Sequence, residues 1–230
     1  MARSVLETLP RWVQQQVLSA RRRWQRSHLK DPRWAFLFES PPAQEWVALD
    51  CETTGLDVRR DEIIAIGAVR IRERRILTRE RLDLRVRPTR EVAADSVRVH
   101  RLRQQDVADG MPVAEAMEQL LYFIGSRPLV GYYLAFDVAM LDRALARCFG
   151  LVLPQPRIEI SALYYDWQFR QLPLYRQHDN AEIDLRFASI MQTLALPMLP
   201  AHDAVNDAVM AAMAFIKLRE LRREATRPRS

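Results

Sequence analysis

Two acidic side chains stand close together where an apolar run ends, in the stretch EWVALDCETTGLD at residues 45–57. The apolar residues predict a strand, and the side chains of a strand alternate between its two faces. Asp50 and Glu52 therefore project the same way. At about 4 Å and an effective dielectric constant of about 20, two such charges repel by about 4 kcal/mol. A cation between the carboxylates would remove this cost, and oxygen ligands alone favour Mg²⁺ or Mn²⁺ over zinc.

Asp50 and Glu52 could form a metal site, or they could lie apart in water in an ordinary loop at the end of the strand. The residues that follow them help to distinguish these alternatives. Thr53, Thr54 and Gly55 follow directly. Threonine hydroxyls offer hydrogen bonds, and glycine lets a ligand approach the backbone closely. The two acids alone would indicate the loop, but the segment that follows them favours a ligand site.

A metal site needs more ligands, and two further acids lie in apolar surroundings. Asp137 follows a predicted short strand in PLVGYYLAFDVAMLDRAL, where Asp142 is its competitor and is expected to face solvent. Asp207 lies one turn into an apolar helix in LPAHDAVNDAVMAAMAF. Asp203 is a candidate N-cap of that helix, because its carboxylate could accept a hydrogen bond from a free N–H of the first turn. His202 precedes the cap, where a lone histidine is more often a surface or capping residue than a catalytic one.

Length and composition indicate one globular α/β domain with an extension. The chain has 230 residues, of which 49% are hydrophobic and 28% are charged, and single domains of this size bury a substantial core. No apolar run approaches the roughly 18 residues of a membrane helix, and we expect no signal peptide. Cys51 and Cys148 lie far apart and outside any C-x-x-C pair. We therefore expect a reduced, cytoplasmic protein without a zinc site.

Basic residues concentrate at the two ends of the chain, which carries a net charge of +6. Residues 1–30 contain seven basic residues and one acidic residue, and residues 217–230 contain six and two. The residues between them therefore carry a net negative charge. Basic ends around an acidic middle suggest a polyanionic partner whose reaction needs cations at the site. The alternative is that these basic residues only solvate exposed helix faces.

Hydrophobic periodicity predicts strands first and then helices that alternate with short strands. A helix is predicted at 5–28 and a linker at 39–46, where two prolines are adjacent. Strands are predicted at 46–51, 62–71 and 75–86 and, as a short buried strand, within SRPLVGYY at 126–133. Further helices are predicted at 113–124, 135–148, 161–171, 183–195 and 203–223. This order favours a mixed sheet with helices packed on its faces.

Three motifs follow one another along the chain: DCETTG at 50–55, FD at 136–137 and HDAVND at 202–207. In combination they resemble the motifs of the DEDDh exonucleases, the superfamily that contains the proofreading epsilon subunit of bacterial replicative DNA polymerase, RNase T and oligoribonuclease. The resemblance covers about residues 45–216. The segment VRVHRLRQQDV at 97–107 also resembles one in the proofreading branch.

The second motif departs from the family pattern. Tyr132 and Tyr133, in GYYLAFD, stand where many members have His-Asn or Asn before the Phe-Asp pair. Any contact that this asparagine makes in those members is absent here. The acid of the motif, Asp137, is retained, so all four acids and the histidine of the family are present.

The resemblance implies an α/β protein with an RNase H-like fold. Such a fold has a central five-stranded mixed sheet flanked by helices, here with an extra N-terminal helix. It divides the chain into a basic helical extension and linker at 1–44, an exonuclease domain at 45–223 and a basic tail at 224–230. The long linker and polymerase-binding tail of proofreading subunits have no counterpart in the sequence after 203–223. We therefore expect a stand-alone or differently partnered nuclease.

The extra N-terminal helix has three alternative roles. It could bind nucleic acid through Arg21, Arg22 and Arg23, or dock a protein partner through Trp12 and Trp24. It could also pack on the domain as a cap. We favour packing, because apolar residues and tryptophans recur near helical spacing.

The resemblance also implies two divalent ions, Mg²⁺ or Mn²⁺, about 3.5–4 Å apart, which activate water and stabilise the extra charge at phosphorus. Asp50 would bridge the ions, and Glu52, Asp137 and Asp207 would complete the two sites. His202 would be the general base, since histidine commonly titrates near neutral pH.

The substrate would meet the loop after the first acids. Thr53, Thr54, Gly55 and Leu56 would contact the terminal nucleotide, with Leu56 as a wedge against a base. Phe136 could stack on the substrate or fill the core, and we favour the core.

The function implied is a two-metal 3′-5′ exonuclease that releases nucleoside 5′-monophosphates from single-stranded ends, with DNA favoured over RNA. One alternative is a weak or non-catalytic nucleic-acid-binding module on the same fold. Others are a ribonuclease for short oligoribonucleotides and a hydrolase or transferase of small phosphorylated metabolites. The complete set of acids argues against the binding module, and the order of the motifs argues against a metabolite enzyme.

Overall fold

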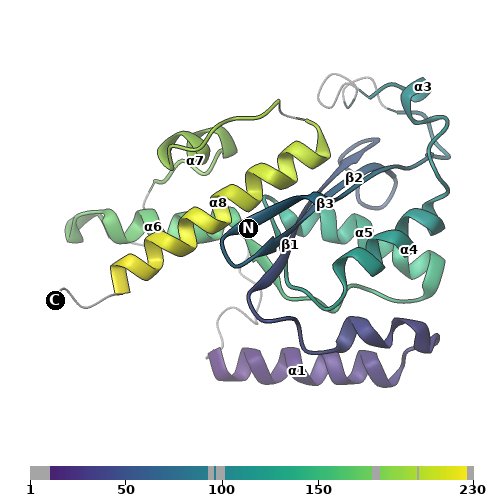
Figure 1. The fold of residues 1–230 in the computed structure, drawn as a ribbon, viewed down its shortest axis with the longest axis horizontal. Coiled ribbons are helices and arrows are strands. Elements are labelled where there is room, and N and C mark those ends of the chain that lie inside the picture. Colours follow the sequence, from purple (N-terminus) through teal and green to yellow (C-terminus); the bar gives the residue numbers. More distant parts are fainter. Residues whose placement is uncertain (1–10, 93–95, 97–101, 178–181, 201, 227–230) are drawn as a thin grey trace.

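Five strands form one mixed sheet in the order β3-β2-β1-β4-β5. The computed structural model describes residues 11–92, 96, 102–177, 182–200 and 202–226. β2 lies antiparallel between β1 and β3, whereas β4 and β5 run parallel to β1. The expected five-stranded mixed sheet is therefore confirmed (Figure 1). The strands are β1 Glu45–Thr53, β2 Ile63–Arg72, β3 Arg75–Arg85, β4 Leu129–Gly131 and β5 Arg157–Glu159.

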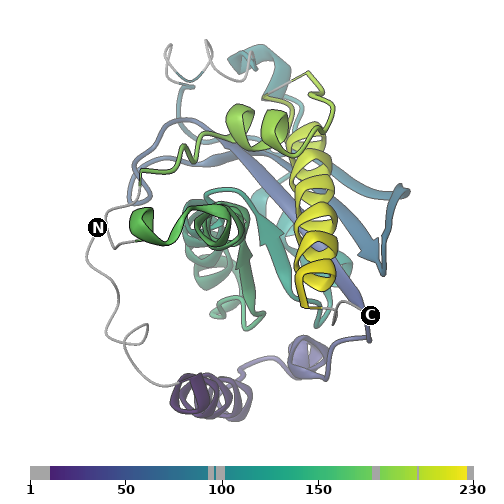
Figure 2. The ribbon, with the colours of Figure 1, turned by 90° about the vertical axis from the view of Figure 1, so that its left-hand side faces the viewer.

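Helices cover both faces of this sheet. α4 and α5 share one core with the sheet, and α6, α7 and α8 share the other. Figures 1 and 2 show α8 lying along one face of the sheet. Among the described residues, no helix has the length and apolar character needed to cross a membrane. The helices are α1 Arg11–Ser27, η2 Pro32–Phe38, α3 Gln104–Val107, α4 Val113–Ile124, α5 Leu134–Phe149, α6 Ile160–Gln171, η3 Leu174–Arg176, α7 Phe187–Thr193 and α8 Ala204–Thr226.

Alternation along β1 assigns its side chains to the two cores. Val47 and Leu49 are buried with α4 and α5, whereas Ala48 is buried with α8. Asp50 and Glu52 follow the parity of Ala48, so they project toward the face that α8 covers. This is the face from which α8 can supply a further acid.

Most of the predicted elements are present, and the differences have local causes. The predicted helix at 183–195 is only Phe187–Thr193. The Asp184 carboxylate accepts a hydrogen bond from the Arg186 N–H at 3.0 Å, and such a turn competes with helix formation. The strand β5 was not predicted, because Arg157–Glu159 has one apolar residue between two charged ones, whereas the equally short β4 is apolar and buried. For the predicted helix at 5–28, residues 5–10 lie outside the described residues.

The expectation that Asp142 faces solvent is wrong. Its side chain is 22% exposed and forms an ion pair with Arg157 at 3.0 Å. It also accepts a hydrogen bond from the Leu153 N–H at 2.7 Å. Asp142 therefore holds residues 153–157, which lead into β5, against α5.

The N-terminal helix α1 lies beside the end of the sheet at which β1 begins (Figure 1). Arg22 fixes it there by donating hydrogen bonds to the carbonyl oxygens of Leu37 at 3.3 Å and Glu39 at 2.7 Å. The expected packing through tryptophan is wrong for Trp24, which is 62% exposed and stacks on His28. The side chain of Trp12 lies outside the described residues. A polar anchor, and not the tryptophan, thus holds the described part of this helix.

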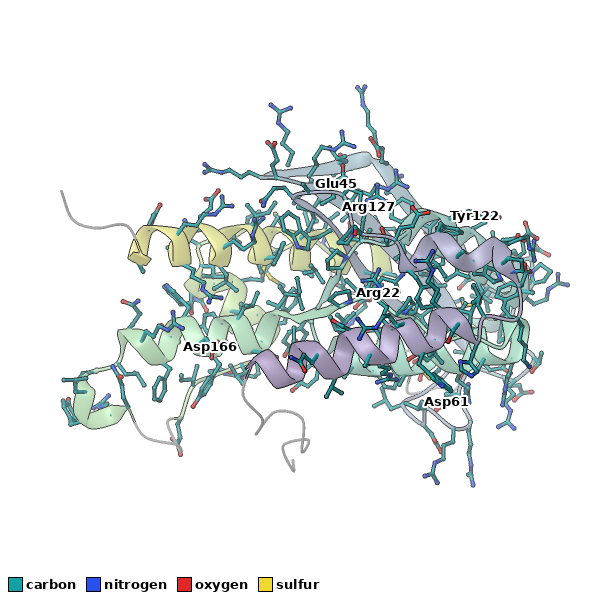
Figure 3. The ribbon with its side chains drawn as sticks, turned by 90° about the horizontal axis from the view of Figure 1, so that it is seen from below. Arg22, Glu45, Asp61, Tyr122, Arg127 and Asp166 are labelled. Carbon is teal, nitrogen blue, oxygen red and sulfur yellow. The ribbon has the colours of Figure 1, made fainter. Side chains whose placement is uncertain are left out.

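The first residue of β1 ties three segments together. The Glu45 carboxylate accepts hydrogen bonds from Arg72 of β2 at 2.8 Å and from Arg127, before β4, at 2.7 Å. Figure 3 shows Glu45 and Arg127 side by side. The two ion pairs of Glu45 fix the start of β1. The other end of this strand carries Asp50 and Glu52.

Candidate active site

Three carboxylates come together where β1 ends. Ligand oxygens of Asp50, Glu52 and Asp207 all lie within 4.8 Å of one another. In the β1–β2 register, Asp50 is opposite Gly67 and Glu52 is opposite Ala65. The predicted pairing of the two strand acids on one face is borne out by this geometry.

A close contact between β2 and α8 brings Asp207 to the strand acids. A Cβ on Gly67 would lie 2.1 Å from the backbone carbonyl carbon of Ala204, the first residue of α8. Only glycine permits the helix to begin this near the strand. Because Gly67 is opposite Asp50, the helix start is aligned with the first acid.

The start of α8 is capped as the sequence predicts. The Asp203 carboxylate accepts a hydrogen bond from the Asn206 N–H at 3.0 Å. The cap fixes where the helix begins and places Asp207 in its first turn. Asp203 also adds negative charge to the site, because it contributes to the raised pKa values of Asp50 and Glu52.

His202 stands immediately before this cap, and it is exposed. Its φ of 63° is in the left-handed region, which is uncommon for residues other than glycine and is found preferentially at functional sites. Its backbone N–H donates a hydrogen bond to the Asp207 carboxylate at 3.0 Å. The histidine is thus held next to the acid cluster through its main chain, and its imidazole does not take part in this bond.

Asp137 approaches from the other side of the sheet. It lies in the first turn of α5 and is 4% exposed. Its carboxylate accepts a hydrogen bond from the Cys51 N–H at 3.1 Å, so it reaches β1 between Asp50 and Glu52. It is not one of the three acids within 4.8 Å, but its charge raises the pKa of Asp50.

The site is electrostatically unfavourable without cations. Burial, followed by the charges of Asp137, Glu52 and Asp207, raises the pKa of Asp50 well above its usual range. Burial and the charge of Asp207 raise the pKa of Glu52 to about 7. Burial raises the pKa of Asp137 to about 8 despite the hydrogen bond from Cys51. These groups resist ionisation unless positive charge is supplied.

The donor set fits hard divalent cations. All ligands in the cluster are carboxylate oxygens, which suit Mg²⁺ and Mn²⁺ better than softer metals. Bound cations would offset the mutual repulsion that raises these pKa values. The cluster of Asp50, Glu52 and Asp207, with Asp137 bonded to the strand between the first two, is therefore a candidate site for divalent cations.

The loop after β1 holds itself together with its own side chains. The Thr54 side chain is buried, and its hydroxyl donates to Asp61 at 3.2 Å and accepts from the Glu62 N–H at 3.0 Å. The Thr53 hydroxyl donates to the Gly55 carbonyl at 2.6 Å. Both hydroxyls thus have partners within the loop. Sequence reasoning missed Asp61, whose only signal was its position in a polar segment.

Two exposed or half-exposed apolar residues flank the acids. Leu56 is 84% exposed at the tip of the loop. Phe136 is half-buried and packs against the core formed with α4 and α5, consistent with the favoured core role.

Glu159 is a supporting residue that sequence reasoning missed. Its carboxylate accepts hydrogen bonds from the N–H groups of Tyr133 at 3.0 Å and Leu134 at 2.9 Å, which begin α5. It also caps α6 through the Ser161 N–H at 3.2 Å. One side chain thus sets the start of the helix that carries Asp137.

Comparison with known proteins gives a family and several relatives. The chain matches the family model described as RNase_T: Exonuclease over residues 47–215. A DNA polymerase III PolC-type from Thermotoga petrophila is 28% identical over 176 residues, which is 76% of this chain but 12% of that protein. A DNA polymerase III subunit epsilon-like protein from Rhodobacter capsulatus is 28% identical over 174 residues, which is 75% of this chain and 23% of that protein. The chain therefore spans only a small part of the length of these relatives.

Solved structures share the fold. Exonuclease I of E. coli in complex with a dA16 oligonucleotide superposes with a TM-score of 0.65 and 17% identity, over 79% of this chain and 42% of that one. Exonuclease I from Methylocaldum szegediense gives a TM-score of 0.63 and 19% identity, over 76% and 40%. The expected RNase H-like fold is confirmed by these matches.

Proposed function

The chain belongs to the exonuclease family whose model it matches, and we propose that it is a metal-dependent 3′-5′ exonuclease. It would release nucleoside 5′-monophosphates from single-stranded ends. The observation that carries the proposal is the cluster of Asp50, Glu52 and Asp207 within 4.8 Å, with Asp137 bonded to the strand between the first two acids.

The four acids would hold two ions, Mg²⁺ or Mn²⁺. Asp50 is central to the cluster, and the charges of Asp137, Glu52 and Asp207 all act on it, which suits a ligand shared by both ions. When bound, two such ions supply an activated water and neutralise the charge that develops at phosphorus and on the leaving oxygen. Glu52, Asp137 and Asp207 would complete the two sites.

His202 would accept the proton of the attacking water. A general base must reach the water that the acids position, and the main-chain bond to Asp207 holds His202 beside them. Its exposed position before α8 leaves the imidazole accessible to substrate. Histidine in this role typically contributes about 10²–10⁴-fold in rate.

The loop after β1 would receive the terminal nucleotide. Because the hydroxyls of Thr53 and Thr54 hold the loop in shape, we assign direct contacts to the backbone at Gly55 and to the exposed side chain of Leu56. Phe136 would add an edge of apolar surface beside Asp137. A free 3′ end of the nucleic acid fits this protein loop better than the interior of a nucleic-acid strand does, because its terminal 3′-hydroxyl can approach the protein backbone at Gly55 closely.

Single-stranded DNA is the substrate that we favour. Two relatives that match about three quarters of this chain are named for DNA polymerase III, and the Exonuclease I neighbour is described with a DNA oligonucleotide. We also propose that residues 45–223 form the catalytic domain and that the protein works in the cytoplasm, where its two free cysteines would stay reduced.

A panel of 5′-labelled oligonucleotides tests the proposal. It contains single-stranded DNA, a duplex with a mismatched end, RNA and very short oligomers, each incubated with Mg²⁺, Mn²⁺ or a chelator. We expect a ladder that shortens from the 3′ end on single-stranded DNA and stops in chelator. Shortening from the 5′ end, or no cleavage of any member with either metal, would overturn the proposal.

A further inference from the structure

Tyr133 is an exposed aromatic residue in a strained backbone conformation. Its side chain is 61% exposed, and its φ of 53° and ψ of 28° are left-handed. For a bulky residue this conformation is rare and costs energy, and it is tolerated mainly where the surroundings enforce it at functional sites. Asparagine or glycine would adopt it more readily.

The surroundings do enforce it. The Glu159 carboxylate accepts the Tyr133 N–H at 3.0 Å, which fixes the backbone. The ring packs edge-to-face on Tyr132, with centroids 4.7 Å apart. Tyr132 in turn donates its hydroxyl to the Leu185 carbonyl at 2.9 Å and stacks on Phe187 at 4.7 Å. Three segments of the chain thus hold one exposed ring in place.

Tyr133 lies at the start of the helix that carries a proposed metal ligand. Tyr133 is the N-cap residue of α5, whose first turn carries Asp137, and the Phe136 N–H bonds to its carbonyl at 2.9 Å. Four residues of an α-helix rise by about 6 Å, so the backbone of the N-cap residue lies about this far along the axis from that of Asp137. A base within the first few nucleotides of a strand held at the acids would therefore lie within reach of the ring.

We propose that Tyr133 is a stacking platform for a base near the 3′ end of the substrate. The inference rests on the proposed nuclease function and adds a specificity-determining contact to it. A fixed aromatic face binds any base without sequence preference and requires that the base be unpaired. The platform would thus favour single-stranded ends, and the Phe187–Tyr132 stack would hold it ready before substrate arrives.

Equilibrium binding tests this platform without relying on cleavage. We would measure the Kd of a fluorescent single-stranded DNA by anisotropy in Mg²⁺. Every protein carries Asp207→Asn, so that bound DNA stays intact, and this single variant is the parent for comparison. Adding Tyr133→Asn removes the ring but suits the left-handed backbone. It should raise Kd by roughly five- to a hundredfold, the range for loss of one stacked base. Tyr133→Phe should keep the Kd of the parent, because the ring and not the hydroxyl stacks.

A series of oligonucleotides with one abasic residue at each position near the 3′ end identifies the stacked base. At one position the parent should bind as weakly as Tyr133→Asn, because the ring has no base to contact. Tyr175→Ala, which removes a tyrosine that is 78% exposed far along the chain on η3, is the control and should bind as the parent does.

Two results would overturn the platform. One is a Kd for Tyr133→Asn within twofold of the parent. The other is the same ratio of Kd between Tyr133→Asn and the parent at every abasic position. The ring would then contribute to affinity without contacting any one base, which would mean that it only supports the fold. Neither depends on turnover, so a failure of the proposed nuclease activity would be seen separately in the oligonucleotide panel.

Discussion

The backbone N–H of His202 donates a hydrogen bond to the carboxylate of Asp207 at 3.0 Å. The bond joins the proposed general base to a proposed metal ligand without using the imidazole. It follows that the two side chains can be changed separately, since a substitution at residue 202 keeps its N–H and an asparagine at residue 207 keeps an acceptor oxygen.

Substitutions at these two positions should separate metal binding from proton transfer. Asp207→Asn should abolish turnover and weaken Mn²⁺ binding, because it removes a charged ligand. His202→Asn, which suits the left-handed backbone, should keep Mn²⁺ affinity and lose about 10²–10⁴-fold in rate. Titration calorimetry with Mn²⁺, beside a rate assay, measures both. Equal losses of Mn²⁺ affinity in the two variants would show that His202 is a ligand.

Metal-free protein should lose stability as pH rises through neutrality. Burial and neighbouring acids raise the pKa of Glu52 to about 7 and that of Asp137 to about 8, whereas unfolded carboxyls titrate near about 4. The folded state thus binds more protons between these values, and its stability falls with rising pH until the folded groups have ionised. For each excess proton, stability falls by about 1.4 kcal/mol per pH unit, or about 3–6 °C in Tm.

Thermal unfolding in chelator between about pH 6 and 8.5 measures this slope. Asp50→Asn should flatten it, because it removes a charge from the cluster, and Mg²⁺ should raise the Tm most at the high-pH end. A Tm in chelator that rises over this range would contradict the electrostatic description of the site.

Gly67 should be required for activity because it sets the position of α8. In Gly67→Ala the new methyl group would meet the Ala204 backbone at 2.1 Å, so the helix start and Asp207 must shift. A misplacement of about 1 Å can cost on the order of 100-fold in rate. The rate on single-stranded DNA, measured well below the Tm of the variant, shows this loss.

Gly150→Ala is the matched control. Gly150 has a φ of 66°, and an added Cβ would meet only the Lys30 side chain, at 3.4 Å. The left-handed conformation should cost about 1–2 kcal/mol in stability without moving the acids. If Gly67→Ala keeps its rate, or if both variants lose activity equally, the close contact between β2 and α8 does not position the site.

The basic cluster of α1, formed by Arg21, Arg23 and Arg26, should not affect the rate of cleavage of the shortest substrates. α1 lies beside the start of β1 (Figure 1), whereas the acids lie at its other end. Strand geometry of about 3.3 Å per residue separates Glu45 from Glu52 by about 23 Å. Changing Arg21, Arg23 and Arg26 to glutamine should therefore leave the rate on oligomers of about four nucleotides unchanged.

Long single strands decide whether α1 contacts substrate at all. A flatter salt dependence of KM for oligomers of about 30 nucleotides would indicate phosphate contacts at the cluster, and an unchanged slope would assign it to solvation. Arg22 is left intact in this variant, because it anchors α1 to the carbonyls of Leu37 and Glu39. A loss of rate on the short oligomers would place α1 nearer the acids than the fold does.

Local rules predicted the parts of the site that depend on one element. Strand alternation correctly placed Asp50 and Glu52 on one face, and capping preference identified Asp203 at the start of α8. These inferences need only a period or a cap, both of which are written in a few consecutive residues.

Contacts between distant segments were beyond such rules. Asp142 was expected in solvent, yet it holds the approach to β5 through Leu153 and Arg157. Glu159 caps the helix of Asp137 from β5, a short strand whose two charged residues gave no apolar signal. In both cases the partner is set by how the chain folds back on itself, which the spacing of residues along one element does not contain.

Hydrolysis in water enriched in ¹⁸O, with mass analysis of the released nucleotides, tests the central claim most directly. If Asp50, Glu52, Asp137 and Asp207 hold ions that direct water onto phosphorus, each nucleoside 5′-monophosphate released from single-stranded DNA should carry one heavy oxygen in its phosphate. Release should cease in chelator and in Asp50→Asn. Unlabelled products, products with a 3′-phosphate, or release that continues in chelator would contradict the account.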